Sequence, residues 1–229
     1  MRIQLYVSKT GYCSRRETER MLRAGRITVN GVQATKDTFV EVTDTILLDG
    51  KPIPLKEREI YLLLHKPIGI ICTAQKTVKN NLVDYLNYPE RIFAVGRLDK
   101  DSEGLLLLTN NGDVVNKMMR VEEGHEKEYI VTVDRPFPDR LMEKMAGGVY
   151  MLGQTTKPCT ISRVDERTFR IVLTQGLNRQ IRRMTKTFGY YVTKLVRVRI
   201  MNLSIEGIAY GEWRELSEEE VQKLLEALD

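Results

Sequence analysis

From residue 60 onward, the chain alternates between two patterns of apolar and polar positions. Short apolar runs bounded by Gly, Asn, Pro or charged residues are typical of strands, and apolar residues three or four positions apart are typical of helices. Strands are therefore expected at 60–64, 92–95, 105–109, 128–133, 159–163, 169–174 and 193–200. Helices are expected at 80–86, 113–119, 138–146, 178–188 and 217–228. This mixture shows no internal repeat and predicts an α+β domain with a largely antiparallel sheet.

The first fifty residues follow another pattern, in which two short helices precede a hairpin. Ser14 and Glu17 have the spacing of a capping box at the start of the second helix, and Gly25 is a natural end for it. Asn30-Gly31 lies between two strand-like runs and indicates a type I′ hairpin, with a further strand at 45–48. We expect these elements to form a compact unit of their own.

A segment with two prolines and alternating charges separates the two regions. Such a composition leaves little to bury and is typical of a linker. We therefore predict a first domain at 1–50, a linker at 51–59 and a second domain at 60–229. A chain of 229 residues has room for one small and one large domain.

The charge of the chain is concentrated near its beginning. Residues 1–30 hold seven Lys or Arg against two Glu, which accounts for the whole formal net charge of +5. Arg16, Arg20 and Arg23 recur at helical spacing on one face of the expected second helix. A solvated helix face would explain single arginines, but a localised basic patch of this kind favours nucleic acid as the partner.

Cysteine and histidine usage restricts the chemistry that the chain could perform. The three cysteines, Cys13, Cys72 and Cys159, are far apart and form no short motif, which favours reduced thiols in a cytoplasmic protein and argues against zinc. The chain has only two histidines, His65 and His125, which is too few to favour a histidine-based metal site or catalytic triad. No apolar run has the length of a membrane span, and no signal-like apolar stretch follows the first residue.

The stretch 96–104 places two cations and three carboxylates between two expected strands. Loops held between strands often carry functional sites, so one of these carboxylates is a candidate for chemistry. Asp99, Asp101 and Glu103 also match the first half of a calcium loop. That interpretation fails because the twelfth position would be Asn110 in place of Glu, and because a strand follows where a helix is needed. We therefore expect no metal.

The same loop begins the motif Gly-Arg-Leu-Asp-Lys-Asp-Ser-Glu-Gly-Leu-Leu-Leu-Leu-Thr-Asn-Asn-Gly. This motif resembles the active site of RNA pseudouridine synthases of the RsuA/RluB/RluE/RluF group. The resemblance implies that Asp99 is the catalytic residue, and it leaves Asp101 and Glu103 to shape the loop. Other motifs, among them His-Glu-Lys-Glu-Tyr and Gly-Glu-Trp-Arg, are most similar to the RluF branch. That branch has a longer basic tail than this chain, which ends at Asp229.

Two further residues complete the expected active site. Arg182 falls at the edge of the apolar stripe of the helix at 178–188, where a half-buried guanidinium needs a carboxylate partner. We expect Asp99 to be that partner, although a structural acid would also serve. The Gln-Gly-Leu-Asn-Arg-Gln-Ile-Arg-Arg-Met motif resembles the family motif in which this arginine contacts the catalytic Asp. By the same resemblance, Tyr129 stacks beneath the target uracil, and Lys66 of Leu-His-Lys-Pro supports the site. The Lys66 ammonium could also hold a phosphate.

The RNA contacts are expected on both domains. The sequence from Ser14 to Gly31 resembles the S4 RNA-binding domain, whose second helix and following turn lie on structured RNA. In the first domain the expected contacts are Arg15, Arg16, Arg20, Arg23 and Arg26. In the second domain they are Lys66, Arg97, Leu98, Lys100, Arg179, Gln180, Ile181, Arg183 and Lys186.

The resemblance implies a fold of a small S4 domain joined to a catalytic domain with a largely antiparallel bent sheet and flanking helices. It also implies isomerisation of uridine to pseudouridine in ribosomal RNA, with 23S rRNA near the peptidyl transferase centre as the first choice and 16S rRNA or tRNA as others. No cofactor is needed, because the reaction involves no redox change. We expect a cytoplasmic monomer without membrane association.

Two other classes of protein fit part of the pattern. A non-catalytic S4-type ribosome assembly factor would use the same arginines, but a carboxylate within a cationic surface repels phosphate and would not help it. A metal-dependent nuclease would need Asp99 and Asp101 to hold magnesium.

Overall fold

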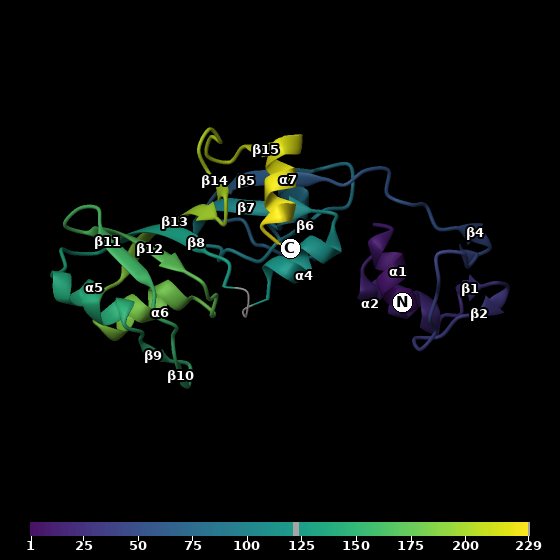
Figure 1. Cartoon of the computed structure of the whole chain (residues 1–229), viewed down its shortest axis with the longest axis horizontal. Helices are drawn as coiled ribbons and strands as arrows, with labels where there is room; N and C mark the ends of the chain where they lie inside the picture. Colours follow the sequence, from purple (N-terminus) through teal and green to yellow (C-terminus); the bar gives the residue numbers. More distant parts are fainter. Residues whose placement is uncertain (121–123, 229) are drawn as a thin grey trace. The chain divides into compact units, whose positions relative to one another are not determined.

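The computed structural model describes residues 1–120 and 124–228, which fall into two compact units. The first unit contains Met1–Ile60 with two short segments from later in the chain, and the second contains most of the chain from Tyr61 onward. Each unit has its own core of buried side chains, and Figure 1 draws the helices and strands of both. No helix among the described residues is long and apolar enough to cross a membrane.

The first unit has two helices and a four-stranded antiparallel sheet with the order β2-β1-β3-β4. Its elements are α1 (Ile3–Lys9), α2 (Arg15–Arg23), β1 (Ile27–Val29), β2 (Val32–Gln33), β3 (Ile46–Leu48) and β4 (Lys51–Pro52). Buried Ile3 and Val7 of α1 share one core with Leu22 of α2 and Ile27 of β1. The expected helices and hairpin are therefore present, and the sheet takes in the first two residues of the expected linker.

Local signals explain most of this unit. The Ser14 hydroxyl accepts a hydrogen bond from the Glu17 amide at 3.2 Å and caps α2. The Glu17 carboxylate pairs with Arg20 at 2.9 Å, so only half of the predicted capping box is formed. Asn30 and Gly31 have φ values of 50° and 81°, as a type I′ hairpin turn requires.

The second unit is built on a nine-stranded sheet in which β11-β12-β8-β13-β7-β5-β15 follow one another, with β14 on β13 and β6 on β7. Its strands are β5 (Tyr61–Lys66), β6 (Phe93–Ala94), β7 (Glu103–Thr109), β8 (Lys127–Val133), β11 (Thr160–Arg163), β12 (Thr168–Leu173), β13 (Val192–Ile200), β14 (Leu203–Ser204) and β15 (Trp213–Glu215). A separate hairpin joins β9 (Tyr150–Met151) to β10 (Gln154–Thr155). The pairs β11–β12, β12–β8, β8–β13, β13–β14 and β15–β5 are antiparallel, and β7–β13 is parallel. The largely antiparallel sheet is confirmed.

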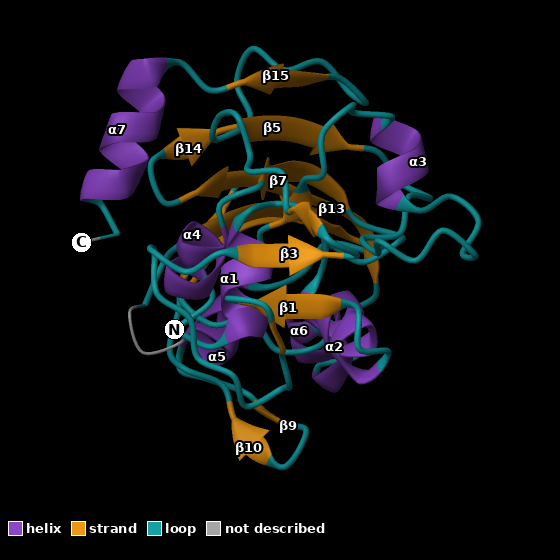
Figure 2. Cartoon of the chain, turned by 90° about the vertical axis from the view of Figure 1, so that its right-hand side faces the viewer, coloured by secondary structure: helices purple, strands orange, loops and turns teal. Residues whose placement is uncertain are grey.

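Among the described residues, five helices accompany this sheet at positions close to those predicted. They are α3 (Leu82–Leu86), α4 (Gly112–Met118), α5 (Asp139–Ala146), α6 (Gln180–Thr187) and α7 (Glu218–Glu226). In Figure 1, α5 and α6 lie next to β11 and β12, and in Figure 2, α3 and α7 lie at opposite ends of β15. Ser217 and Glu220 form a complete capping box at the start of α7.

Two clusters of buried side chains hold the unit together. In one, Met145 of α5 and Met184 of α6 pack with strands β8, β12 and β13. In the other, Leu224 of α7 packs with Leu63 of β5 and Leu105 of β7. All seven residues of β7 are buried, which explains its continuous run of leucines.

One glycine permits the parallel contact at the centre of the sheet. Gly104 has φ +118°, and a Cβ there would lie 2.9 Å from the Arg197 carbonyl carbon and closer still to the Arg197 backbone nitrogen and oxygen. Only glycine allows β7 and β13 to approach this closely. The approach brings the loop that precedes β7 next to β13.

Candidate active site

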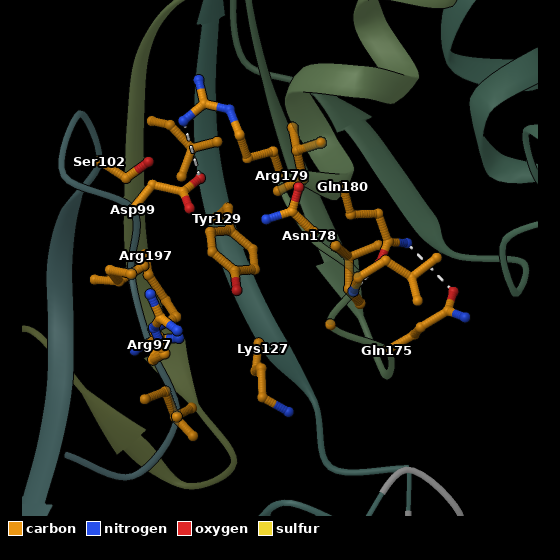
Figure 3. A pocket seen from close by; sticks show the side chains of 18 of the residues that line it. Arg97, Asp99, Ser102, Lys127, Tyr129, Gln175, Asn178, Arg179, Gln180 and Arg197 are labelled. Carbon is orange, nitrogen blue, oxygen red and sulfur yellow. Dashed lines mark hydrogen bonds and ion pairs between the residues drawn. The ribbon is translucent and has the colours of Figure 1, made fainter. Parts of the chain in front are cut away.

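A cavity of about 380 Å³ opens in the second unit beside the loop at 96–102. Its walls include residues of that loop, the inner face of β8 and β13, and the segment that leads into α6. Figure 3 shows Asp99, Tyr129 and Arg179 around it. The sequence-predicted site residues Asp99, Tyr129 and Arg182 all line this one cavity.

Asp99 lies on a tight turn just before β7. The Ser102 amide donates to the Asp99 carbonyl at 3.1 Å, and the Gly69 amide donates to the Lys100 carbonyl at 2.7 Å. The strand β7 begins at Glu103, where a calcium loop would have to continue as a loop. The turn therefore holds the Asp99 side chain, about one third exposed, at the mouth of the cavity.

Lys66 holds this turn in place through hydrogen bonds to the backbone. Its side chain is 0% exposed, and its ammonium donates to the carbonyls of Pro67 at 2.8 Å and Ser102 at 2.9 Å. Burial lowers the pKa of Lys66. The expectation that Lys66 holds a phosphate is not supported, because both its position and its hydrogen bonds are those of a buried structural cation.

The arginine that pairs with Asp99 is Arg179, which corrects the prediction for Arg182. The Arg179 guanidinium lies 3.6 Å from the Asp99 carboxylate. It also forms two hydrogen bonds to the Asp101 carboxylate at 2.9 and 2.8 Å, and these lower the pKa of Asp101. Arg179 can reach both acids because it precedes α6 in a left-handed conformation, with φ 50°.

Arg182 acts on the backbone of the turn. Its side chain is only 14% exposed, more buried than predicted, and it donates to the Asp101 carbonyl at 2.7 Å, the Ser102 hydroxyl at 3.1 Å and the Val192 carbonyl at 3.2 Å. Its nearest carboxylate is that of Asp101, at 3.6 Å. Arg182 thus connects α6, the turn and the start of β13, and its effect on Asp99 is one of position.

The other two acids of the loop are fully engaged. The Asp101 carboxylate is held by Arg179, and Glu103 is buried within β7 with Lys194 at 3.3 Å. These contacts agree with the prediction that Asp101 and Glu103 shape the loop.

Tyr129 projects from β8 into the cavity. It lies opposite Ile171 of β12 and Arg197 of β13 in the sheet, which fixes the direction of its ring. Figure 3 shows the ring in the middle of the cavity, with Asp99 toward one end of the ring and Lys127 toward the other. Its open face is available for a flat ligand.

The sequence analysis missed Arg197 and Lys127, two cations in the same wall. Arg197 is buried on β13, and Lys127 is the first residue of β8. A signal for both existed, since alternation along a strand puts Lys127 on the face of Tyr129 and Arg197 on the face of buried Leu195. An arginine at a core-facing position of a strand is the sequence signal that would have identified Arg197.

The predicted RNA contacts divide by exposure. Leu98, Gln180 and Ile181 are buried and line the cavity. Exposed side chains are found at Arg97, Lys100, Arg179, Arg183 and Lys186 in the second unit, and at Arg15, Arg16, Arg20, Arg23 and Arg26 in the first. Of the first-unit arginines, Arg20 pairs with Glu17 and Arg26 with Asp49.

Comparisons with known proteins identify the family. Residues 60–187 match the family model for RNA pseudouridylate synthase, and residues 1–46 match that for the S4 domain. This chain belongs to the RNA pseudouridine synthase family. Its fold also resembles a solved pseudouridylate synthase, with a TM-score of 0.72 and 24% identity over 98% of this chain and 99% of the other.

Several curated pseudouridine synthases are similar to the chain over nearly all of its length. The dual-specificity RNA pseudouridine synthase RluF of Salmonella typhi is 46% identical over 100% of this chain and 80% of its own length. The ribosomal large subunit pseudouridine synthase B of Bacillus subtilis is 36% identical over 97% of this chain and 95% of its own. The predicted family and its S4 domain are therefore confirmed.

Proposed function

We propose that this pseudouridine synthase isomerises a specific uridine of 23S ribosomal RNA, near the peptidyl transferase centre. The observation that carries the proposal is Asp99 at the mouth of a cavity whose wall offers the Tyr129 ring. The Bacillus subtilis relative is named for the ribosomal large subunit, which supports the choice of RNA. The proposed setting is a monomer in the cytoplasm.

The cavity suits a single extruded nucleotide. Its volume of about 380 Å³ is that of a small-ligand site. An enzyme that acts on a base in folded RNA must first remove it from its stack, at a cost of a few kcal/mol. The Tyr129 ring would replace the lost stacking neighbour, because the flat face of any base can stack on an aromatic ring.

Asp99 is the group proposed to react with the nucleotide. Its partner Arg179 lies at 3.6 Å and is also tied to Asp101, so the guanidinium orients the carboxylate without covering it. Arg182 and Lys66 hold the carbonyls of the turn and keep the carboxylate at the cavity mouth. Preorganisation of this kind lowers the barrier because little movement remains at the moment of reaction.

The exposed cations are proposed to bind the RNA backbone. Arg183 and Lys186 lie on the exposed side of α6, and Arg15, Arg16 and Arg23 are exposed on α2. Lysine and arginine near phosphates release counterions and give salt-dependent affinity. Joining the S4 unit to the catalytic unit raises the effective concentration of the uridine at the site.

The test is pseudouridine mapping of unmodified 23S rRNA after treatment with each protein variant. The wild-type protein should modify a single uridine, and Asp99→Asn should abolish the modification while RNA affinity and thermal stability are kept. Asp37→Asn, which changes an exposed aspartate of the first unit, is the matched control and should be fully active. Equal modification by wild type and Asp99→Asn would refute the role of Asp99. Modification of 16S rRNA or tRNA alone would refute the choice of RNA.

A further inference from the structure

Arg197 is a buried arginine without a counter-ion. The residue is only 2% exposed, and its guanidinium makes no ion pair among the described residues. Its Nε donates to the Leu105 carbonyl at 2.8 Å, while Nη2 is enclosed and has no hydrogen-bond partner. Burial of an uncompensated guanidinium is costly, so a group that binds there should carry negative charge or an acceptor oxygen.

The acidic side chains of the two neighbouring strands, Glu128 on β8 and Glu103 on β7, point away from Arg197. On β8, Glu128 points to the face opposite Tyr129, where it pairs with Arg199 at 2.7 Å and with Arg170. On β7, Glu103 lies beside Val196, which faces away from its neighbour Arg197, and pairs with Lys194. Neither of these carboxylates therefore faces Arg197, and the cavity that Arg197 lines is the side from which a further acceptor can reach it.

Lys127 adds a second cation to the same wall. It lies two residues before Tyr129 on β8, so both side chains share the cavity face. Its ammonium donates to the His125 carbonyl at 3.0 Å, and its pKa is lowered by burial and by the charge of Arg197. Two neighbouring cations in a partly enclosed site can stabilise negative charge that develops on a bound ligand.

We propose that Arg197, assisted by Lys127, binds the carbonyl oxygens of the target uracil and stabilises the negative charge that the base carries during the reaction. The proposal rests on the proposed function. In Figure 3, Asp99 lies toward one end of the Tyr129 ring and Lys127 toward the other, with Arg197 alongside. If a uracil stacked on this ring with its ribose next to Asp99, the carbonyl oxygens of the uracil would lie near Arg197 and Lys127.

The chemistry of the isomerisation requires such a site. The C1′–N1 bond breaks with its electron pair left on the pyrimidine, so O2 and O4 share a negative charge. The C1′–C5 bond then forms, a base removes the proton from C5, and N1 gains a proton, so that all atoms are conserved. Attack of Asp99 on the base in place of the ribose would also move charge onto O4. Either route benefits from a cation at the pyrimidine oxygens.

A backbone phosphate offers the same anionic oxygen chemistry as the pyrimidine, and the experiment separates the two. Arg197→Met removes the charge and keeps a long unbranched side chain, while Arg197→Lys restores the charge without the planar guanidinium fork. Arg170→Met is the control, because Arg170 also lies in this sheet but is exposed and pairs with Glu128 on the other face. Single-turnover rates, RNA affinity and its salt dependence are measured on unmodified 23S rRNA transcripts.

The rate of Arg197→Met should fall about 10- to 100-fold, as expected for one charge-assisted hydrogen bond to the transition state. Its RNA affinity should stay unchanged, Arg197→Lys should regain part of the rate, and Arg170→Met should keep the wild-type rate. In transcripts that contain 5-fluorouridine, C1′–N1 cleavage should be less sensitive to Arg197→Met, because fluorine already stabilises the departing anion. Arg197→Met should be at least as stable to heat as wild type, since it loses a buried unpaired charge.

Other outcomes would overturn the proposal. An unchanged rate, or an equal loss on both kinds of transcript, would show that Arg197 does not stabilise the base. Weaker RNA affinity with a smaller salt slope would identify a phosphate as the ligand. If wild type and Arg170→Met also formed no pseudouridine, the proposed function itself would fail, and the role of Arg197 would fail with it.

Discussion

The contact between Gly104 and Arg197 gives the sharpest prediction about stability. In Gly104→Ala, the new Cβ would meet the backbone of Arg197 at less than 3 Å, and no flexible side chain can move to relieve the contact. Backbone strain at a φ of +118° costs about 1–3 kcal/mol for a residue with a side chain. Displacing the packed strand costs about 1–3 kcal/mol more. The free energy of unfolding should therefore fall by about 4 kcal/mol.

Thermal and urea unfolding, followed by a probe in the second unit, would measure this loss. For a protein of this size, about 4 kcal/mol corresponds to a fall in Tm of roughly 10 °C. Gly207→Ala is the matched control, because Gly207 has φ +76° and open space around its Cβ position. It should cost about 1 kcal/mol. Equal effects of the two substitutions would refute the argument, since the close approach would then contribute nothing.

Two further predictions concern pH and RNA binding. The Arg214 guanidinium lowers the pKa of Glu220 from 4.5 to about 2, so this pair stabilises the fold above pH 4.5 and its contribution is lost as the pH falls toward 2. Glu220→Gln should therefore be less stable than wild type at neutral pH and equally stable near pH 2, as measured by urea unfolding; a constant difference would contradict this. The double variant Arg20→Ala and Arg23→Ala should weaken RNA binding and reduce its salt slope by about 2, as measured by filter binding over a series of salt concentrations. An unchanged slope would mean that α2 does not lie on the RNA.

Periodicity predicted the scaffold of the site well. The helix expected at 178–188 is present as α6, and Ile181 and Met184 of its apolar stripe are buried. The strands at 128–133 and 193–200 were also found, and Tyr129 lies on the first of them and lines the cavity. These features depend on local pattern and burial, and both are written into short stretches of sequence.

The pairing of charges was predicted less well. Arg179 and Arg182 lie three positions apart at the start of the same helix, and the choice between them depends on the left-handed backbone at Arg179 and on the shape of the turn. Neither is visible in hydrophobic periodicity. The short strands β14 and β15 were missed for a related reason, since two or three residues are too few to show a period.

The way the turn at Asp99 is anchored has a consequence for variation within it. Gly69, Lys66 and Arg182 donate to the main-chain carbonyls of Lys100, Ser102 and Asp101, while side-chain contacts to the turn end on Asp101, Ser102 and Glu103. Lys100 is held through its carbonyl, which every residue type has, so the position of the turn depends only weakly on the side chain at position 100. The exposed residue at position 100 is thus free to be exchanged as the RNA surface around the uridine changes. A designer could alter the RNA that the protein recognises at this edge while leaving the reacting carboxylate in its place.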